Sequence, residues 1–161
     1  MDTAQHSIYK TKEFLGILVF TLILRLIWVF IIPVEPVSDS VMYDAFAQSI
    51  SQGNGYAFPQ GNLTAYWPVG TSAIYGALYY IFGHSFNAII LFNLVVSVVS
   101  AAFIMLLAER WINTRSALFA GLIFALWPSQ IQFTSILASE LIFNCFIASS
   151  SLEIKAIIST F

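Results

Sequence analysis

Charged residues are scarce in this chain of 161 residues. Only 9% of the residues are charged and 59% are hydrophobic, whereas a soluble domain carries about 25% charged residues. The net charge of −2 excludes the basic surface that nucleic-acid binding requires. A single cysteine, Cys145, excludes an internal disulfide, and its apolar surroundings favour a role as a small hydrophobic residue. The sequence therefore predicts an integral, multi-pass membrane protein.

Motifs for nucleotide and metal chemistry are also missing. The sequence has no glycine-rich nucleotide loop, no cysteine–histidine cluster and no Ser-His-Asp order. His84 has no partner ligand nearby in the sequence, so we interpret it as an interfacial residue. No cofactor is predicted, and the sequence does not decide whether a divalent metal takes part.

Long apolar runs predict a single membrane domain over residues 1–161, all-α, with about four transmembrane helices. The first run has no small-residue cleavage site after it and is too long for a signal peptide. At 1.5 Å per residue, its 19 residues cover roughly the thickness of a bilayer core. The third run carries Ala117, Gly121 and Ala125 at a spacing of four, which favours close helix packing. The predicted spans are 14–32, 86–108, 116–136 and, more weakly, 141–158.

The interval 33–85 is mostly polar and contains no Lys or Arg. We expect a short amphipathic helix at 38–52, with Ser38 as its N-cap. The apolar run 68–82 is too short to cross a bilayer comfortably, which indicates a re-entrant or interfacial helix.

Two aspartates fall within the amphipathic helix. Asp39 lies in its first turn and shares a face with Tyr43, four residues later. Asp44 points elsewhere, and we interpret it as a solvated surface residue.

The basic residues set the predicted orientation. If 68–82 does not cross the membrane, all the flanking cations fall on one side, which the positive-inside rule assigns to the cytoplasm. The N-terminus is then cytoplasmic, and 33–85 is an external loop on the same side as Glu140. The flanking cations are Lys10, Lys12, Arg110, Arg115 and Lys155.

Each candidate site residue has a competing interpretation. Asp39 is either a general base beside the membrane or a helix-terminal charge in a solvated loop. Glu140, between two apolar runs, either lines a cavity or belongs to an interfacial turn. Arg25, near the middle of the first span, faces protein or snorkels to the surface, or else binds a lipid phosphate. The aromatic group in the loop is an aromatic belt or a sugar or lipid platform; it comprises Tyr56, Phe58, Tyr66 and Trp67.

An ordered set of short motifs extends over nearly the whole chain. It begins with D-x-x-x-Y-x-x-x-A at Asp39, Tyr43 and Ala47, followed by GNGY, TAYWPVG and IFG. WPSQIQF and SEL follow near the third span. The set resembles the N-terminal part of GT-C class polytopic glycosyltransferases. More narrowly, it is similar to family 39, the protein O-mannosyltransferase and aminoarabinose-transferase-like proteins.

The resemblance implies a function and a site. Such enzymes transfer a sugar from a polyprenyl-phosphate donor in the membrane lipid to an acceptor hydroxyl, whose identity the sequence does not reveal. By position, Asp39 matches the catalytic acid of the first external loop and Glu140 matches a second acid. We assign substrate contacts to Tyr43, Tyr66, Trp67 and Arg25.

The chain departs from the family pattern at two places. Ser40 stands where a second acid often follows the first. Tyr66 and Trp67 precede Pro68, where the aminoarabinose branch has an acidic–Lys pair. The second departure argues against the metal site and the particular sugar of that branch.

Three hypotheses follow from these observations. The first is that the chain is the N-terminal portion of a lipid-linked-sugar glycosyltransferase in a bacterial inner or plasma membrane. The apolar pattern weakens over residues 145–161, which is the reason to expect only a portion of such an enzyme. The second is a catalytically inactive protein of the same ancestry that binds polyprenyl lipid or a partner subunit. The third is an unrelated small transporter or scaffold component, which should carry functional polar groups at mid-membrane depth.

Overall fold

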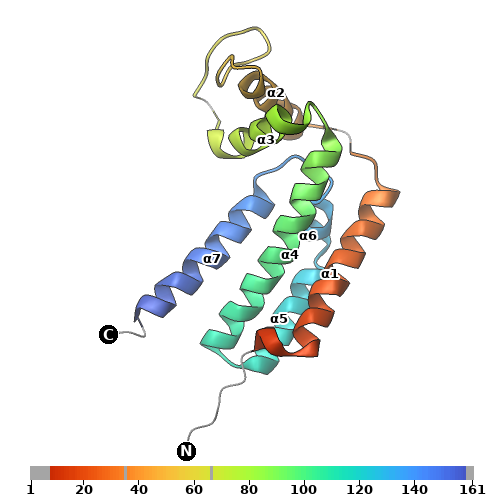
Figure 1. Ribbon diagram of the computed structural model, residues 1–161, viewed down its shortest axis with the longest axis vertical. Helices are drawn as coiled ribbons and strands as arrows, with labels where there is room; N and C mark the ends of the chain where they lie inside the picture. The colour runs from red at the N-terminus through yellow and green to blue at the C-terminus, as the bar shows by residue number, and fades with distance from the viewer. Residues whose placement is uncertain (1–7, 35, 66, 159–161) are drawn as a thin grey trace, which may run out of the picture.

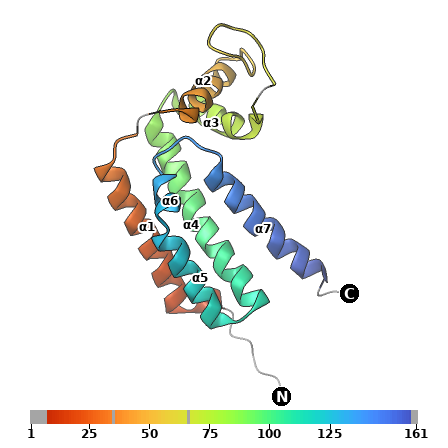
Figure 2. The ribbon, with the colours of Figure 1, turned by 180° about the vertical axis from the view of Figure 1, so that it is seen from behind.

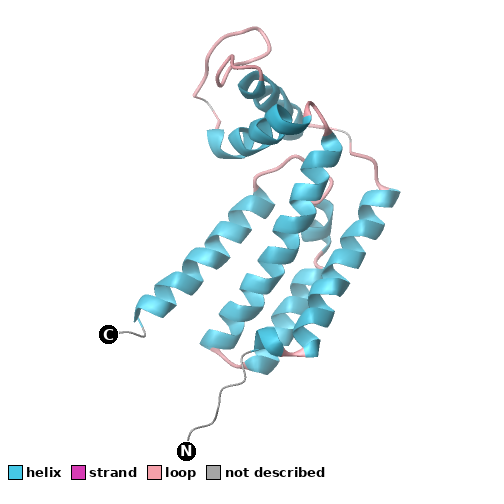
Figure 3. Ribbon diagram, viewed as in Figure 1, coloured by secondary structure: helices cyan, strands magenta, loops and turns pink. Residues whose placement is uncertain are grey.

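The computed structural model describes residues 8–34, 36–65 and 67–158, with side chains up to residue 154. Every named element in these ranges is helical, which confirms the predicted all-α class (Figure 3). Four helices run along a bundle, and two more lie across one end of it (Figures 1 and 2). The bundle helices are α1 (Lys12–Ile31), α4 (Phe86–Trp111), α5 (Thr114–Leu126) and α7 (Glu140–Ile158). The end helices are α2 (Asp39–Ser51) and α3 (Val69–Phe82), and short helices occur at η1 (Ile8–Lys10) and α6 (Pro128–Gln132).

Length and composition qualify α1 and α4 as membrane-spanning helices. α3 and α5 are shorter apolar helices. α7 covers 141–158, the range of the predicted weaker span, and its passage across a membrane stays a prediction. The chain is therefore an integral membrane protein whose bundle is centred on α4, which contacts α1, α5 and α7.

The small residues of α5 allow it to approach α1 and α4 closely. Ala117 and Ala125 have no exposed surface, and Gly121 is buried between them. A Cβ atom on Gly121 would lie 2.5 Å from the Sδ atom of Met105 in α4 and 3.0 Å from Ile17 in α1. The small-residue face predicted from the spacing of four is thus the packing face.

The third predicted span, 116–136, is not one continuous helix, and its passage across a membrane stays a prediction. α5 ends at Leu126, and α6 starts at Pro128. Proline has no backbone N–H, and its ring clashes with the preceding turn, so it ends a helix or begins a new one. Residues 133–139 then run without regular helix to the start of α7.

Arg25 of α1 occupies the position where α5 is broken. Its guanidinium donates to the carbonyl oxygens of Phe124 (3.4 Å) and Ala125 (3.4 Å), and its Nε atom donates to Ser97 Oγ of α4. Pro128 has no N–H for the Phe124 carbonyl, so Arg25 provides the missing donor. A cation at a helix C-terminus is also favoured by the helix dipole. The cost of a charge inside the bundle is thereby offset by hydrogen bonds.

α2, α3, the hairpin 56–64 and the residue pair Ser139–Glu140 form what we name the capped end (Figures 1 and 2). The two helices predicted at 38–52 and 68–82 are both present. They cross closely at Gly76, where a Cβ atom would lie 2.9 Å from Ile50 Cγ2 and 3.1 Å from the Ala47 carbonyl oxygen. The starts of α1 and α5 and the ends of α4 and α7 lie at the other end of the bundle.

Candidate functional site at the capped end

Asp39 is the first residue of α2, and its side chain is exposed. Within the described residues, the Ser38 hydroxyl donates a hydrogen bond to Asp39 Oδ1 at 3.4 Å. Ser38 is the N-cap residue, as predicted, but its side chain makes no capping bond to the helix backbone. The Asp39 carboxylate is therefore accessible to a ligand at the end of a helix whose dipole favours negative charge.

The backbone before Asp39 is strained. Ser38 has φ 53° and ψ −125°, a region that favours glycine, and Ser40 N–H bonds to the Val37 carbonyl oxygen at 3.1 Å across the turn. Such a conformation persists only where the surrounding structure enforces it, and it occurs preferentially at functional sites. Here it makes a sharp turn that places Asp39 at the tip of α2.

One turn after Asp39, Tyr43 is buried and meets Trp67 edge to face, with ring centroids 5.4 Å apart. Both belong to an apolar cluster that also includes Leu137 and Ile142, on either side of Glu140. The helices that carry Asp39 and Glu140 are therefore joined through one packed core. Tyr66 lies outside the described residues.

Glu140 is the exposed first residue of α7. Two buried polar residues fix the segment before it. Tyr75 of α3 donates to the Ala138 carbonyl oxygen at 3.1 Å and lies 3.3 Å from Asn93 Oδ1. Asn93 of α4 donates through Nδ2 to carbonyl oxygens of the same segment; these belong to Phe133, Thr134 and Ile136, at 3.5, 3.3 and 3.4 Å. The break after α5 thus leaves carbonyl groups without helical hydrogen-bond partners, and the Asn93 side chain donates to them instead.

Burial raises the pKa of Tyr75 from its ordinary value of 10.0 to about 12, and the nearby charge of Glu140 acts in the same direction. Tyr75 is consequently a neutral hydrogen-bond donor throughout the physiological range. Asn93 and Tyr75 were not among the predicted site residues, because their partners lie 18 to 63 residues away. The one available signal was a polar residue, Asn93, within a long apolar run.

Arg25 lies within the bundle and does not contact the other candidate site residues that the structure describes. It is fully buried in the bundle, with its donors directed to Ser97 and to the α5 backbone. The sequence left three alternatives for Arg25: facing protein, snorkelling to the surface or binding a lipid phosphate. This geometry fits a residue that faces protein, and the contact with a lipid phosphate stays a prediction.

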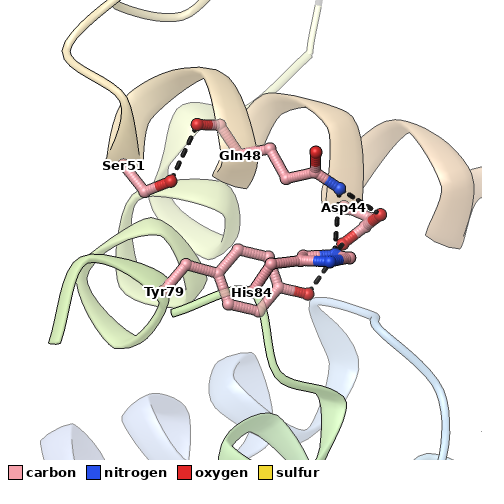
Figure 4. A network of polar contacts seen from close by, with 5 residues as sticks. All are labelled: Asp44, Gln48, Ser51, Tyr79 and His84. Carbon is pink, nitrogen blue, oxygen red and sulfur yellow. Dashed lines mark hydrogen bonds and ion pairs between the residues drawn. The ribbon is translucent and has the colours of Figure 1, made fainter. Parts of the chain in front are cut away.

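A polar network involving Asp44 was missed by the sequence analysis (Figure 4). Asp44 Oδ1 accepts from the Tyr79 hydroxyl at 2.7 Å and lies 2.9 Å from His84 Nε2. Its other oxygen, Oδ2, accepts from Gln48 Nε2 at 3.0 Å. Asp44 and His84 are 40 residues apart, so no local pattern linked them, and the interpretation of Asp44 as a solvated residue was incomplete.

The network separates the roles of the two aspartates. Three polar side chains converge on the Asp44 carboxylate: Gln48 from α2, Tyr79 from α3 and His84 from the α3–α4 connection. The carboxylate therefore ties these segments together. Burial, followed by the bond to Asp44, raises the pKa of Tyr79, which keeps that phenol protonated. Asp39 has a single long contact and remains accessible. A base must reach a proton on a ligand, and on that criterion Asp39 is the better candidate.

The fold and the capped end define a class: a helical integral membrane protein with carboxylates at one end of its bundle. The family described as dolichyl-phosphate-mannose-protein mannosyltransferase matches residues 67–157, more than half of the chain. The chain belongs to this family of membrane glycosyltransferases of the GT-C type. The matched range includes Trp67, Tyr75 and Glu140 and begins after Asp39. No curated protein and no solved structure matches the chain.

Proposed function

We propose that the capped end takes part in sugar transfer from a polyprenyl-phosphate donor to an acceptor hydroxyl, with Asp39 as the general base. The observation that carries the proposal is the contrast between the two aspartates of α2. Asp39 is exposed at a strained helix start, whereas Asp44 is contacted by the side chains of Gln48, Tyr79 and His84. Family membership supports the reaction class, and the geometry supports the choice of residue.

In this mechanism the Asp39 carboxylate accepts the proton of the acceptor hydroxyl. The acceptor oxygen then bonds to the anomeric carbon of the sugar, and the bond from that carbon to the lipid phosphate oxygen breaks. Polyprenyl phosphate leaves with the bonding electrons, so a single displacement inverts the anomeric carbon. Glu140 supplies a second carboxylate from the other side of the shared apolar cluster. Trp67, which is partly exposed, offers aromatic surface to the substrate, and the buried Tyr43 packs against it.

We further propose that the capped end faces the external side of a bacterial plasma membrane. Lys10, Lys12, Arg110 and Arg115 flank the opposite end of the bundle, where the positive-inside rule expects the cytoplasm. This orientation lets the prenyl chain remain in lipid while the sugar reaches the aqueous surface.

The test compares Asp39→Asn with Asp44→Asn, the same chemical change at two positions of one helix. Transfer of labelled mannose from polyprenyl-phosphate mannose is measured with the membrane-embedded protein, together with its thermal unfolding. Asp39→Asn should lower the transfer rate by about 10²–10⁴-fold, the usual contribution of general-base catalysis, with unfolding unchanged. Asp44→Asn should lower stability and reduce transfer less.

Other outcomes separate the alternatives. Transfer that persists in Asp39→Asn would remove Asp39 from the catalytic role. If the wild-type protein binds the donor lipid without turnover, and Asp39→Asn binds it equally well, the protein is a non-catalytic lipid binder of the same ancestry.

A further inference from the structure

A second polar surface lies on the face of α2 that is turned away from Asp39. It is a groove of about 380 Å³ between α2 and the segment 52–61. Asp39 and Gln48 are nine residues apart, which is about 2.5 helical turns, so they project from opposite sides of the helix. The groove is therefore distinct from the surface that carries Asp39 and Tyr43. Its α2 wall consists of Val41, Asp44, Ala45, Gln48 and Ser49.

The opposite wall of the groove is a well-formed hairpin. Phe58 N–H bonds to the Asn62 carbonyl oxygen at 2.9 Å, and Gly61 N–H bonds to the Phe58 carbonyl oxygen at 2.8 Å. Gly61 has φ 86°, which a residue with a side chain adopts only with strain. Phe46 of α2 packs against Tyr56 and Phe58, with ring centroids 4.3 and 5.3 Å apart. Both walls are thus fixed relative to each other before any ligand binds.

Neutral hydrogen-bonding side chains make up four of the ten residues that line the groove, and five of the others are apolar or glycine. Gln48, Gln52 and Asn54 contribute amides, Ser49 contributes a hydroxyl, and Phe58 contributes an apolar ring. None of its lining residues is a Lys or Arg. The one acidic group, Asp44, is already contacted by the Tyr79 hydroxyl, His84 and Gln48, which orient its carboxylate.

This chemistry selects the class of ligand. A phosphate or carboxylate would meet no Lys or Arg in the groove and would lie beside Asp44. A basic ligand would compete with the donors that Asp44 already has. Hydroxyl groups, in contrast, pair with amides as donors and acceptors at once, and the apolar face of a sugar ring suits the Phe58 side chain. Concave sites with a few fixed polar groups and an aromatic surface are typical of small-molecule recognition.

We propose that this groove is a binding site for a neutral saccharide, separate from the proposed transfer site. Asp44 and Gln48 are its preoriented polar groups, since the network in Figure 4 holds both. Gln52, Asn54 and Ser49 complete the hydrogen-bonding wall. The inference does not depend on Asp39 as a base, because the two surfaces lie on opposite faces of α2.

The test measures binding of linear mannotriose, a neutral trisaccharide, to the full chain in detergent micelles by ligand-observed NMR. The variant Ser49→Ala/Gln52→Leu removes two groove groups and leaves Asp44, Tyr79, His84 and Gln48 in place. Saturable binding by the wild type, weakened about tenfold or more in the variant, is expected from the loss of one or two hydrogen bonds. Asp39→Asn, on the opposite face, is the matched control and should bind as the wild type does.

Several results would overturn the proposal. They are the absence of saturable binding by the wild type, equal binding by the groove variant, or an equal loss in Asp39→Asn. Tighter binding of mannose 6-phosphate than of mannotriose would also overturn it, because it would identify an anion site. Circular dichroism of each variant confirms that the helical fold is intact. Failure of Asp39→Asn to impair sugar transfer would leave this inference standing, so the two proposals fail independently.

Discussion

The bundle and the capped end are built on different physical principles. In the bundle, α1, α4 and α5 pack through small residues such as Gly121, and the buried cation Arg25 bonds to the carbonyl groups at the end of a broken helix. At the capped end, polar side chains connect helices far apart in sequence, and two carboxylates remain exposed. The contrast indicates that the bundle is held by close helix packing, while the capped end carries the exposed groups available for chemistry.

The largest expected effect comes from overpacking the bundle. Gly121→Val places atoms within the space occupied by Met105 and Ile17, which should cost about 2–3 kcal/mol of unfolding free energy. The measurement is reversible unfolding in mixed detergent micelles, followed by circular dichroism. Gly16→Val is the control, because a Cβ atom on Gly16 meets nothing within 4 Å. Equal stability of the two variants would contradict the close packing of α5.

The next effect tests the buried cation. Arg25→Met removes the donors that reach Ser97 and the carbonyl groups of Phe124 and Ala125, and these buried acceptors lose their partner. We expect a loss of about 2 kcal/mol, measured in the same unfolding assay. The stability of Arg25→Lys should fall between those of the wild type and Arg25→Met, since lysine keeps the charge but lacks the planar fork of donors. A stable Arg25→Met protein would mean that the break at Pro128 needs no donor from α1.

The smallest effect sharpens the description of the capped end. Tyr75→Phe removes the hydrogen bond to the Ala138 carbonyl oxygen and should cost about 1 kcal/mol. Because burial raises the pKa of Tyr75 from 10.0 to about 12, the folded protein favours the neutral phenol. The contribution of the protonated Tyr75 hydroxyl to the folding stability is therefore fully present below pH 10 and is lost as the pH rises toward 12.

Two measurements check the Tyr75 prediction. In a near-ultraviolet titration of tyrosinate, Tyr75→Phe should remove one late-titrating phenol. The alkaline loss of stability should also become shallower, although Tyr79, whose pKa is raised as well, keeps part of it. An unchanged titration curve would place the Tyr75 hydroxyl in contact with water.

Much of the fold could be predicted because its signals are local. Helices α2 and α3 and the long helices α1 and α4 follow from apolar periodicity and length. The close packing of α5 follows from the spacing of Ala117, Gly121 and Ala125. The break within 116–136 was missed even though Pro128 was visible, because a proline can kink a helix or end it. Here Arg25, which lies 99 and 100 residues before its two acceptors, supports the ending by bonding to the last turn of α5.

The candidate site was predictable in part. Asp39, Tyr43, Trp67 and Glu140 were named from position and resemblance, and their roles stay predictions. The network around Asp44 and the support that Tyr75 and Asn93 give to the segment before Glu140 were not foreseen. Apart from Gln48, which is four residues from Asp44, the partners are 18 or more residues apart. Hydrogen bonds at such separations leave no periodic pattern in the sequence.

By itself, the sequence determined the membrane class, the long helices and the two short helices of the interval 33–85. Those features depend on hydrophobic periodicity and on the need to satisfy backbone hydrogen bonds within each helix in an apolar medium. The tertiary structure alone decided which aspartate is held and which remains accessible, and what the buried arginine contacts. A side chain's role there depends on neighbours brought together by packing, and no stretch of sequence contains that information.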